Sequence, residues 1–442
     1  MRGEGLNGLS SNSSLPTWLL YLENLHPKGQ AGIELGLERV RRVKAELGQS
    51  QHCPVIIVGG TNGKGSTCAT LESILTFSGY RVGCYTSPHL FKYNERVRLN
   101  GTPVEDQALC AAFARVEVAR QQAERAALTY FEFGTLAAWE VFAAAGVDVA
   151  ILEVGLGGRL DAVNVYDAGV AIVTTVDLDH TDWLGDSRAS IGFEKAGIFR
   201  AGKPALCADP SPPQSLLDHA GALGADLRLI GREFGVELVE DQQNWQWWCQ
   251  AGENVIRHQF ELPAMPGGGQ LRNAAVALAA LQCLHDPLPV TLAAIERGLR
   301  ETVVPGRFQI VQQKPLIIID VAHNPQAVWE LAANLDRLPV AGRTHAIVGM
   351  LADKDAGAAL AVLKGKIDVW HLATLEGWRG APAQRLAAII AELALGGEVF
   401  LYPSPQMAMQ TVQGSAAESD RILAFGSFHT VAGVMDTLGY GR

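Results

Sequence analysis

A β-branched run that ends in glycines and passes directly into a helical pattern constrains this chain more than any other feature. Val55–Gly60 has the composition of a buried strand, and Thr61–Gly65 (TNGKG) is a glycine-rich turn before a segment with helical apolar spacing. Glycines let backbone N–H groups close around phosphate oxygens, and a helix N-terminus favours an anion. Lys64 adds a mobile positive charge, and Ser66 and Thr67 add hydroxyls that suit phosphate or Mg²⁺. The segment predicts a strand–loop–helix unit that binds a nucleotide phosphate.

The loop departs from the common P-loop pattern at two positions. That pattern has a glycine five residues before Gly63, where this chain has Val58. It also has a serine or threonine directly after the lysine, where Gly65 intervenes. An ordinary glycine-rich turn between a strand and a helix is therefore the alternative interpretation. Taken by itself, the segment favours phosphate binding over that alternative.

Length and charge indicate the class of protein. A chain of 442 residues predicts two to three domains, each with a core of its own. Hydrophobic residues make up 48% and charged residues 19%, which is the mix of an ordinary globular protein. The net charge of −10 argues against a nucleic-acid partner, because nucleic-acid-binding domains usually carry a basic face. An acidic protein that binds ATP must gather its positive charge locally, and Lys64 lies at one such place.

The cysteines and the N-terminal residues indicate a compartment. The seven cysteines include no C-x-x-C pair, so they are interpreted as buried thiols and not as a disulfide framework or a zinc site. Residues 1–14 are polar, lack the apolar segment of a secretory signal and are predicted to form a disordered tail. No stretch has the apolar length that spans a bilayer, so we expect no membrane partner. These features predict a soluble, cytoplasmic protein, and nothing in them demands an oligomer, so we expect a monomer.

Strand and helix patterns alternate along most of the chain. After two helical pieces within 15–47, the alternation runs through the glycine-rich loop to a helix that ends near residue 300. It restarts after 301–307 with apolar runs that read as strands at 316–320, 345–348, 367–372, 398–402 and 421–425. The pattern predicts an α/β fold: a P-loop-type, mostly parallel sheet domain at 15–300, a linker at 301–307, and a smaller doubly wound, Rossmann-like domain at 308–442.

Two stretches break this alternation. Residues 87–104 are predicted to form a long loop of mixed charge. Residues 233–262 are polar and aromatic and are predicted to form β-hairpins. The hairpins carry Trp245, Trp247 and Trp248, which either stack on a ligand ring or pack the hairpin onto the domain; packing is the favoured interpretation.

Acidic and basic side chains follow the predicted strands of the first domain. Glu153 ends one strand, where a carboxylate suits Mg²⁺, although an ion pair with Arg159 is an equal alternative. His180 follows the next strand and is interpreted as a metal ligand, a general base or a structural histidine. Lys195 lies on a short helix further on, and from its spacing alone it is interpreted as a solvated lysine.

A second group of such residues surrounds the predicted linker. Arg307 lies in the linker, Asp320 and His323 follow a strand of the second domain, and Asn273 lies near the start of a helix. They are interpreted as a nucleotide cap or, equally, as separate surface and capping residues. Lys354 follows another strand end, and its alternative is a plain surface charge.

In their order and spacing these segments resemble the Mur ligase superfamily and, within it, the bifunctional dihydrofolate synthase/folylpolyglutamate synthases. The resemblance covers nearly the whole chain and accounts for the altered phosphate loop, because GTNGKGS is the normal form in that family. The matching segments are Gly60–Ser66 (GTNGKGS), Thr86–Leu90 (TSPHL), Tyr130–Gly134 (YFEFG), Glu153–Asn164 (EVGLGGRLDAVN), Asp179–Gly185 (DHTDWLG), Glu194–Phe199 (EKAGIF), Asn273, Pro305–Phe308 (PGRF) and Asp320–Pro325 (DVAHNP).

The resemblance implies a role for each matching residue. The ATP-binding residues would be Gly60, Thr61, Asn62, Gly63, Lys64, Gly65, Ser66, Asn273, Arg307 and Asp320. The Mg²⁺ ligands would be Ser87, Glu153 and His180, and Lys195 would be the lysine that is carbamylated in the family. The dihydropteroate contacts would be Thr129, Tyr130, Phe131, Glu132, Leu160, Asp161 and Ala162. Lys354 or the segment Gly426–His429 would bind the incoming glutamate, and His323 or His180 would assist the loss of its proton.

The resemblance also implies a reaction and its substrates. ATP would activate the carboxylate of dihydropteroate, or of tetrahydrofolate and its polyglutamates, as an acyl phosphate that the amine of L-glutamate attacks. A monofunctional folylpolyglutamate synthase is the near alternative, and a cell-wall Mur ligase is a more distant one. A non-catalytic, ATP-dependent switch is the alternative from another class; it predicts a broken metal set, whereas Ser87, Glu153, His180 and Lys195 are all present.

Overall fold

The computed structural model describes residues 9–29, 32–239 and 244–440. Its contacts divide the chain into two compact units. The first unit contains residues up to Leu262 together with Arg272–Thr302, and the second contains Pro263–Leu271 together with the residues from Val303 onward. Residues 1–8 of the predicted tail lie outside the described residues; of the rest, Ser14 is the N-cap of the first helix. The linker predicted at 301–307 contains the end of the first unit.

The first unit is built on an eight-stranded sheet in the order β4-β3-β2-β5-β1-β6-β7-β8. The strands from β2 to β8 in that order pair in parallel, and β3 and β4 add an antiparallel edge. The central strands are buried along their whole length, which explains their continuous apolar runs. The strands are β1 (Val55–Gly59), β2 (Val82–Tyr85), β3 (Val97–Leu99), β4 (Thr102–Pro103), β5 (Val149–Glu153), β6 (Val170–Val173), β7 (Pro204–Cys207) and β8 (Asp226–Leu229).

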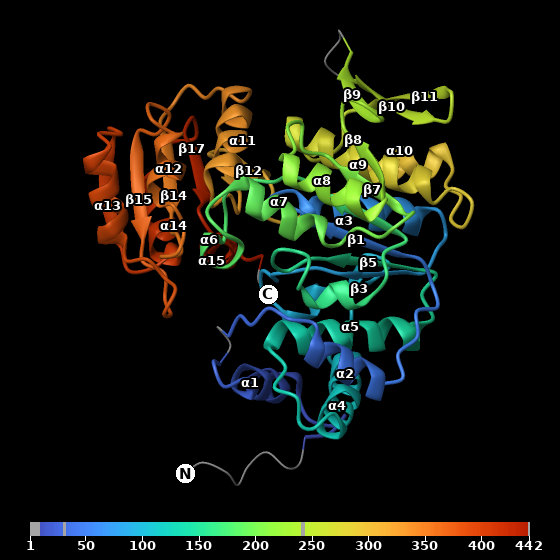
Figure 1. The fold of residues 1–442 in the computed structure, drawn as a ribbon. Coiled ribbons are helices and arrows are strands. Elements are labelled where there is room, and N and C mark those ends of the chain that lie inside the picture. Colours follow the sequence, from blue (N-terminus) through green and yellow to red (C-terminus); the bar gives the residue numbers. More distant parts are fainter. Residues whose placement is uncertain (1–8, 30–31, 240–243, 441–442) are drawn as a thin grey trace. The chain divides into compact units, whose positions relative to one another are not determined.

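Helices cover both faces of this sheet. Figure 1 shows β1 and β5 between α3 on one face and α5 on the other, and α1, α2 and α4 pack outside α5. The 3₁₀ helices are η1 (Tyr93–Arg96) and η2 (Ala162–Val165). The α-helices are α1 (Leu15–Leu25), α2 (Glu38–Glu46), α3 (Lys64–Phe77), α4 (Asp106–Gln122), α5 (Tyr130–Ala145), α6 (Thr181–Leu184), α7 (Arg188–Ala196), α8 (Gln214–Leu223), α9 (Gly268–Cys283) and α10 (Leu292–Glu301).

The two irregular stretches have different outcomes. The prediction of a structureless loop at 87–104 is wrong, because η1, β3 and β4 lie within it; strands of three and two residues are too short to produce a periodic pattern. The hairpins at 233–262 are confirmed as β9 (Phe234–Leu238), β10 (Asn244–Ala251) and β11 (Asn254–Glu261). Trp245 and Trp247 are buried, and the Trp247 indole donates to the carbonyl of Ala275 at 3.1 Å, so the tryptophans pack the hairpin.

The second unit is the doubly wound domain that the alternation predicted. Its six strands have the order β12-β13-β17-β14-β15-β16, with all pairs parallel except β12 and β13. Helices α11 to α13 pack against one side of the core, and α14 and α15 contact the strands from the other. The elements are β12 (Gln309–Gln313), β13 (Leu316–Ile319), α11 (Pro325–Asp336), β14 (Thr344–Val348), α12 (Ala356–Ala361), β15 (Val369–Ala373), α13 (Ala383–Glu392), β16 (Glu398–Tyr402), α14 (Pro405–Gln413), β17 (Arg421–Phe425) and α15 (Phe428–Thr437).

Two further properties were predicted from composition. All seven cysteines are free thiols, and six of them are buried. Within the described ranges, no helix combines the length and the apolar character that crossing a membrane requires.

Candidate active site

The glycine-rich loop connects β1 to α3, and the segment after β6 holds it in place. Thr61 donates its backbone N–H to the carbonyl of Thr175 at 2.8 Å, and its hydroxyl donates to the carbonyl of Asp177 at 3.1 Å. The Asn62 N–H donates to the Thr175 hydroxyl at 3.0 Å, and the Thr174 hydroxyl donates to the Asn62 carbonyl at 2.5 Å. Because β6 pairs with β1, two neighbouring strands fix the shape of the loop.

Two glycines of the loop have no room for a side chain. Gly60 has φ +141° and Gly63 has φ +87°, both in the region that favours glycine. A Cβ on Gly60 would collide with the Thr174 hydroxyl, and a Cβ on Gly63 would collide with the side-chain amide of Asn273 on α9. The structure thus brings Asn273, a predicted nucleotide contact, against the loop.

Two hydroxyls at the start of α3 have no hydrogen-bond partner within the described part of the protein. They belong to Ser66 and Thr67, and both side chains are buried. Lys64 donates its ammonium to the carbonyls of Gly60 and Thr61 at 2.9 and 3.2 Å, so its charge stays on the loop. Buried polar atoms normally have partners, and a helix N-terminus favours an anion. The arrangement fits a phosphate ligand, whereas an ordinary turn gives no reason to bury two unpaired hydroxyls.

The end of β5 places a carboxylate beside this loop. Glu153 is buried, and its Oε2 accepts the backbone N–H of Ser87 at 3.0 Å. A Cβ on Gly65 would lie 3.9 Å from the same oxygen, so the carboxylate faces the start of α3. The alternative that Glu153 pairs with Arg159 is wrong, because Arg159 pairs with Glu194 at 2.8 Å.

His180, the third predicted metal ligand, lies between β6 and α6. Its backbone is left-handed, with φ +53°, and its Nε2 lies 4.0 Å from the Asp179 carboxylate. Within the described ranges, no group of three or more His, Cys, Asp or Glu side chains is placed to hold a metal ion. The predicted set of Ser87, Glu153 and His180 fits Mg²⁺ all the same, because that ion commonly takes few protein ligands and completes its shell with water and phosphate oxygens.

Lys195 is buried in α7, with 3% of its surface exposed. Its interpretation as a solvated lysine, made from spacing alone, is therefore wrong. Burial and the nearby ammonium of Lys64 lower the pKa of Lys195 to about 7, against the opposing effect of Asp179 and Asp161. A large fraction of this amine is therefore neutral near pH 7.

The pKa of Asp161 is shifted in the opposite direction to that of Lys195. Burial raises the pKa of its carboxyl to about 7, although backbone N–H groups and the charge of Lys64 favour the ionised form. Two of those N–H groups belong to Leu156 and Val163, at 2.8 and 3.1 Å. Asp161, Lys64 and Lys195 thus form one electrostatic group beside the glycine-rich loop.

The predicted dihydropteroate segment at the start of α5 has two kinds of residue. Thr129 and Glu132 form a capping box: the Glu132 N–H donates to the Thr129 hydroxyl at 3.3 Å, and the Thr129 N–H donates to the Glu132 carboxylate at 2.8 Å. Arg39 also donates to that carboxylate, at 2.9 Å. Tyr130 and Phe131 are only half-buried and present aromatic surface. The capping box gives Thr129 and Glu132 a structural role, and their contact with a substrate stays a prediction.

The other predicted dihydropteroate segment lies close by. The ring of Phe131 packs on Gly155, where a Cβ would lie 2.7 Å from the ring. Gly155 begins the loop that leads to Leu160, Asp161 and Ala162. Of these, Leu160 is half-buried, and the other two are buried.

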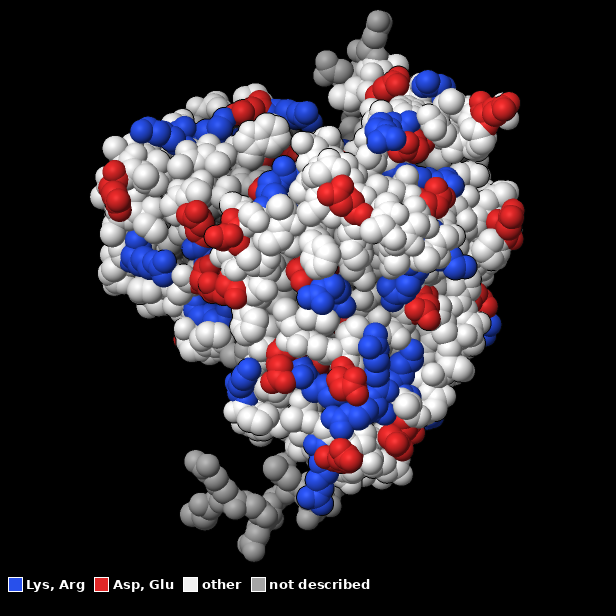
Figure 2. All heavy atoms as spheres, viewed as in Figure 1, with Lys and Arg blue, Asp and Glu red and all other residues white. Residues whose placement is uncertain are grey.

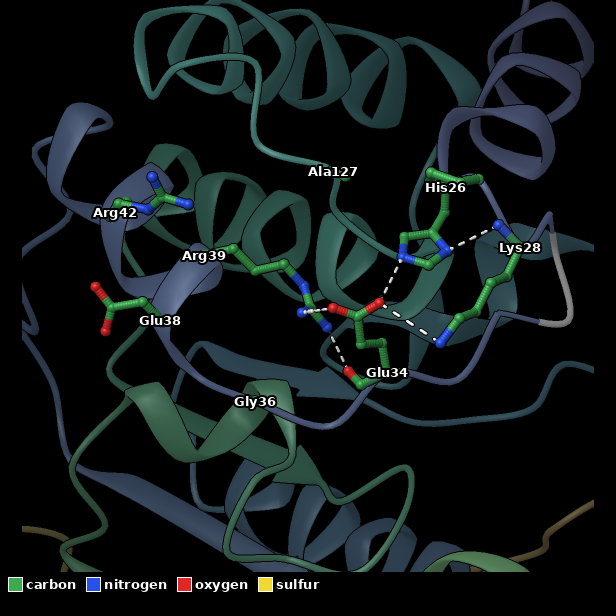
Figure 3. Close-up of a pocket in the computed structure, with 9 residues that line it drawn as sticks. His26, Lys28, Glu34, Gly36, Glu38, Arg39, Arg42 and Ala127 are labelled. Atoms are coloured by element: carbon green, nitrogen blue, oxygen red, sulfur yellow. Dashed lines mark hydrogen bonds and ion pairs between the residues drawn. The ribbon is translucent and has the colours of Figure 1, made fainter.

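A cavity of about 380 Å³ lies on the other side of Arg39 (Figure 3). The Glu34 carboxylate lies at its centre and pairs with Arg39, His26 and Lys28 at 2.6, 3.2 and 3.7 Å. Figure 2 shows lysines and arginines gathered over this region near α2, with acidic side chains between them. Because the central carboxylate already pairs with three of the basic side chains that line the cavity, we assign the cavity no ligand.

The second unit brings its own predicted residues together. Both Asp320 oxygens accept backbone N–H groups, from Phe308 at 2.8 Å and Ala322 at 2.7 Å. Burial raises the pKa of Asp320, against the charge of Arg307, these N–H groups and His323. The Arg307 guanidinium also lies 5.5 Å from the ring centre of Phe428. Arg307 and His323 thus lie close enough to Asp320 for their charges to act on its carboxyl, and the role of the three residues as a nucleotide cap stays a prediction.

The two candidates for glutamate binding both lie at helix starts of the second unit. Lys354 is buried, with 8% of its surface exposed, so its interpretation as a plain surface charge is wrong. It precedes Asp355, the N-cap of α12. In Gly426–His429, Ser427 is the N-cap of α15 and accepts the Thr430 N–H at 3.1 Å. Neither position has a contact that assigns it to glutamate.

Comparison with known proteins places this geometry in a family. Residues 306–428 match the family described as Mur ligase, glutamate ligase domain. Over 431 residues, which are 97% of both chains, the protein is 47% identical to the dihydrofolate synthase/folylpolyglutamate synthase of Escherichia coli K12. It is 40% identical to the Haemophilus influenzae protein of the same name, over 96% of this chain and 97% of that one. The chain belongs to the dihydrofolate synthase/folylpolyglutamate synthase family.

Solved structures of this family agree with the fold. E. coli FolC in complex with DHPP and ADP has a TM-score of 0.89 and 45% identity, over 97% of this chain and 99% of that one. The bifunctional enzyme of Yersinia pestis, complexed with AMPPNP and Mn ion, has a TM-score of 0.88 and 44% identity, over 98% and 100%. Both likenesses extend over the two units, so the predicted α/β architecture and the family resemblance are confirmed.

Some residues that shape the site were missed in the sequence. Thr174 and Thr175 hold the glycine-rich loop through their hydroxyls, although the sequence marked only the end of a strand there. The signal was the pair of threonines directly after β6, since hydroxyls at the end of a buried parallel strand need partners at the sheet edge. Arg39, which holds Glu132, lies 93 positions earlier and left no local signal.

Proposed function

We propose that this chain is an ATP-dependent ligase that joins L-glutamate to dihydropteroate, forming dihydrofolate, and to tetrahydrofolate and its polyglutamates. The observation that carries the proposal is the start of α3, where two buried, unpaired hydroxyls lie beside Lys64 and the Glu153 carboxylate. This arrangement suits a phosphate with a metal ion beside it, and the chain is similar over 97% of its length to a protein with both activities in its name.

The proposed reaction has two steps. An oxygen of the acceptor carboxylate attacks the γ-phosphorus of ATP, the bond to the β-phosphate oxygen breaks, and ADP and an acyl phosphate form. The amine of L-glutamate, after losing a proton, then attacks the acyl carbon, and the C–O bond to phosphate breaks. The amide and inorganic phosphate are the products. Both steps gather negative charge on phosphate and carboxylate oxygens, so the site must supply positive charge and N–H donors.

The protein groups at the loop supply that charge. Gly60–Ser66 would surround the ATP phosphates with backbone N–H groups, and the Lys64 ammonium would leave its loop carbonyls for a phosphate oxygen. Ser87, Glu153 and His180 would hold Mg²⁺, which neutralises phosphate charge when it is bound. Asn273, which lies against Gly63, would contact the nucleotide from α9.

Lys195 is proposed to carry a carbamate. Its burial and the charge of Lys64 lower its pKa to about 7, and the neutral amine is the form that reacts with CO₂. The modification would replace a buried cation near Lys64 with an anion that pairs with Lys64. His180 and His323 are the proposed groups for removing the proton of the glutamate amine.

The remaining proposals concern substrates. Tyr130, Phe131 and Asp161 would bind the acceptor, with the half-buried rings offering a stacking surface. Arg307 and Asp320 would contact the nucleotide, and Lys354 or Gly426–His429 would bind a glutamate carboxylate. We propose a monomer as the working form.

Phosphate release tests the function directly. The protein is supplied with ATP, Mg²⁺ and L-glutamate, and phosphate is measured with dihydropteroate and, separately, with tetrahydrofolate. We expect glutamate-dependent release with both acceptors and a glutamate adduct of each by mass spectrometry. Release with tetrahydrofolate alone would show a monofunctional folylpolyglutamate synthase. Release with neither acceptor would contradict the ligase and favour an ATP-dependent switch.

A further inference from the structure

Arg96 ends the short helix η1 in the stretch that follows the Ser87 segment. Its side chain is half-buried, and its Nε donates to Nδ1 of His89 at 2.9 Å. The guanidinium carbon lies 5.4 Å from the ring centre of Tyr93 and 5.6 Å from that of Tyr130. An imidazole and two aromatic rings therefore hold the guanidinium in one position.

The charge of Arg96 is not balanced by an acid. Among the residues that the structure describes, Arg96 forms no ion pair. Arg98, two positions later, pairs with Glu72 at 2.7 Å and serves the fold. The neighbouring Glu95 carboxylate is occupied by the backbone N–H groups of residues 90 to 92, at 2.6 to 2.8 Å. A half-buried guanidinium without a carboxylate is costly, and its planar donors match the oxygens of a carboxylate ligand.

Arg96 lies between the two parts of the proposed site that an acceptor must reach. The Arg96 carbonyl accepts the N–H of Thr86 at 2.9 Å, and the next residue, Ser87, donates to Glu153. On its other side, the guanidinium faces Tyr130, which belongs to the proposed dihydropteroate segment. The backbone of Arg96 therefore adjoins the segment of Ser87, a proposed metal ligand, and its guanidinium adjoins the proposed acceptor segment.

The aromatic residues around Arg96 suit a ring that carries a carboxylate. Tyr93 and Tyr130 meet edge to face with ring centres 5.7 Å apart, and Tyr85 and Phe131 lie at the same separation. Burial raises the pKa of Tyr93 to about 12, against the charge of Arg96, so the phenol stays neutral. Tyr85 and Tyr93 are buried and support the site from behind, whereas Tyr130 and Phe131 keep exposed surface. Exposed aromatic surface beside a fixed cation recognises an aromatic or amide-linked carboxylate.

We propose that Arg96 binds the reacting carboxylate of the folate acceptor before ATP phosphorylates it. The inference rests on the proposed function, because it names the residue that recognises the acceptor in that same site. His89 is the positioning residue that fixes the guanidinium. Arg96 gives the acceptor a charged anchor that neither Tyr130 nor Phe131 can supply.

The test is the binding of dihydropteroate, measured by calorimetry without glutamate or ATP. We expect Arg96→Gln to raise the Kd about 10- to 100-fold, the loss typical of a charged hydrogen-bonded contact. In steady state, the KM for dihydropteroate rises by a similar factor while the KM for ATP stays within about twofold. Arg96→Lys keeps the charge but not the planar donors, so its Kd lies between the two. Lys92→Gln removes an exposed cation of the same stretch and leaves the Kd unchanged.

The outcomes separate this inference from the proposed function. The inference is overturned, and the function left standing, if wild-type protein binds dihydropteroate and both Arg96 variants bind it with the wild-type Kd. Equal weakening of acceptor and ATP binding also overturns it, because a general disturbance of the fold would explain both. If Arg96→Gln does not fold, Arg96→Lys decides the question by the same two constants. Wild-type protein that fails to bind dihydropteroate contradicts both the function and the inference.

Discussion

Asp161 in the first unit and Asp320 in the second face different cations. The difference distinguishes a group whose cations can lose a proton from one whose cation cannot. Both carboxyls follow a strand, both accept two or more backbone N–H groups, and burial raises the pKa of both. Asp161 faces Lys64 and Lys195, whereas Asp320 faces Arg307. A buried lysine can lose its proton and an arginine cannot, so the cations beside Asp161 can change their charge, whereas the cation beside Asp320 keeps its charge. We infer that the first unit carries the charges that act on the phosphates and that Arg307 and Asp320 of the second unit orient the nucleotide.

The largest effect is expected from the carboxylate beside the phosphate loop. Glu153→Gln keeps the shape but removes the charge, and we expect kcat to fall by about 10³-fold or more, because charge stabilisation at phosphate is lost. The measurement is single-turnover phosphate release. Glu117→Gln breaks a buried ion pair with Arg120 in α4 and serves as the control, with lower stability but unchanged kcat. Normal turnover in Glu153→Gln would remove this residue from the mechanism.

Lys195 tests whether the charge of the first unit is adjustable. Lys195→Arg keeps a cation that cannot be carbamylated, and we expect kcat to fall about 100-fold. With ¹³C-bicarbonate, wild-type protein should show a carbamate signal by NMR above pH 7. The signal should fade as the pH drops through about 7, because the amine is then protonated. The signal should persist in Lys354→Arg, and its presence in Lys195→Arg would assign the carbamate to another residue.

Alanine substitutions of the two glycines that flank α3 distinguish the effect of backbone strain from that of a steric collision at the loop. Gly63 and Gly79 have φ +87° and +89°, so alanine costs each about 1–2 kcal/mol of stability. Only at Gly63 would the new Cβ meet Asn273, whereas Gly79 has open space. We expect Gly63→Ala to raise the KM for ATP about tenfold or more and Gly79→Ala to leave it unchanged. Equal KM values in the two variants would show that the Asn273 contact does not shape the ATP site.

The smallest effect is expected in the second unit. Arg307→Lys keeps the charge but loses the contact with the Phe428 ring, and we expect the KM for ATP to rise about threefold to fivefold, with kcat nearly unchanged. The pH profile of kcat should keep its wild-type shape, because no adjustable charge has been removed. Arg379→Lys changes a surface arginine that pairs with Asp353 and is the control. A large loss of kcat in Arg307→Lys would contradict the division between the units.

The sequence predicted those parts of the fold and site that depend on local pattern. Long apolar runs marked the buried strands, and glycines with Lys64 marked the phosphate loop, because both signals lie within a dozen residues. Short strands such as Val97–Leu99 gave no periodic signal, since their place in the sheet is set by pairing with β2. Local pattern therefore predicted the long central elements better than the short strands at the edge of the sheet.

Burial and partner choice could not be predicted locally. The spacing of Lys195 indicated a solvated lysine, and a surface charge was one of two interpretations of Lys354, yet both side chains are buried. Arg159 was a candidate partner of Glu153, but it pairs with a residue of α7. The family resemblance already argued against a solvated Lys195, because it adds information about distant positions that spacing lacks.

Isotope transfer tests the central claim of acyl-phosphate ligation most directly. Dihydropteroate labelled with ¹⁸O in its carboxylate is incubated with the protein, ATP, Mg²⁺ and L-glutamate, and the released phosphate is analysed by mass spectrometry. The account predicts that one labelled oxygen per turnover moves from the carboxylate to phosphate, only when glutamate is present to complete the reaction. Glutamate-dependent amide formation with unlabelled phosphate would contradict it, because the carboxylate oxygen would then never have been bonded to phosphorus.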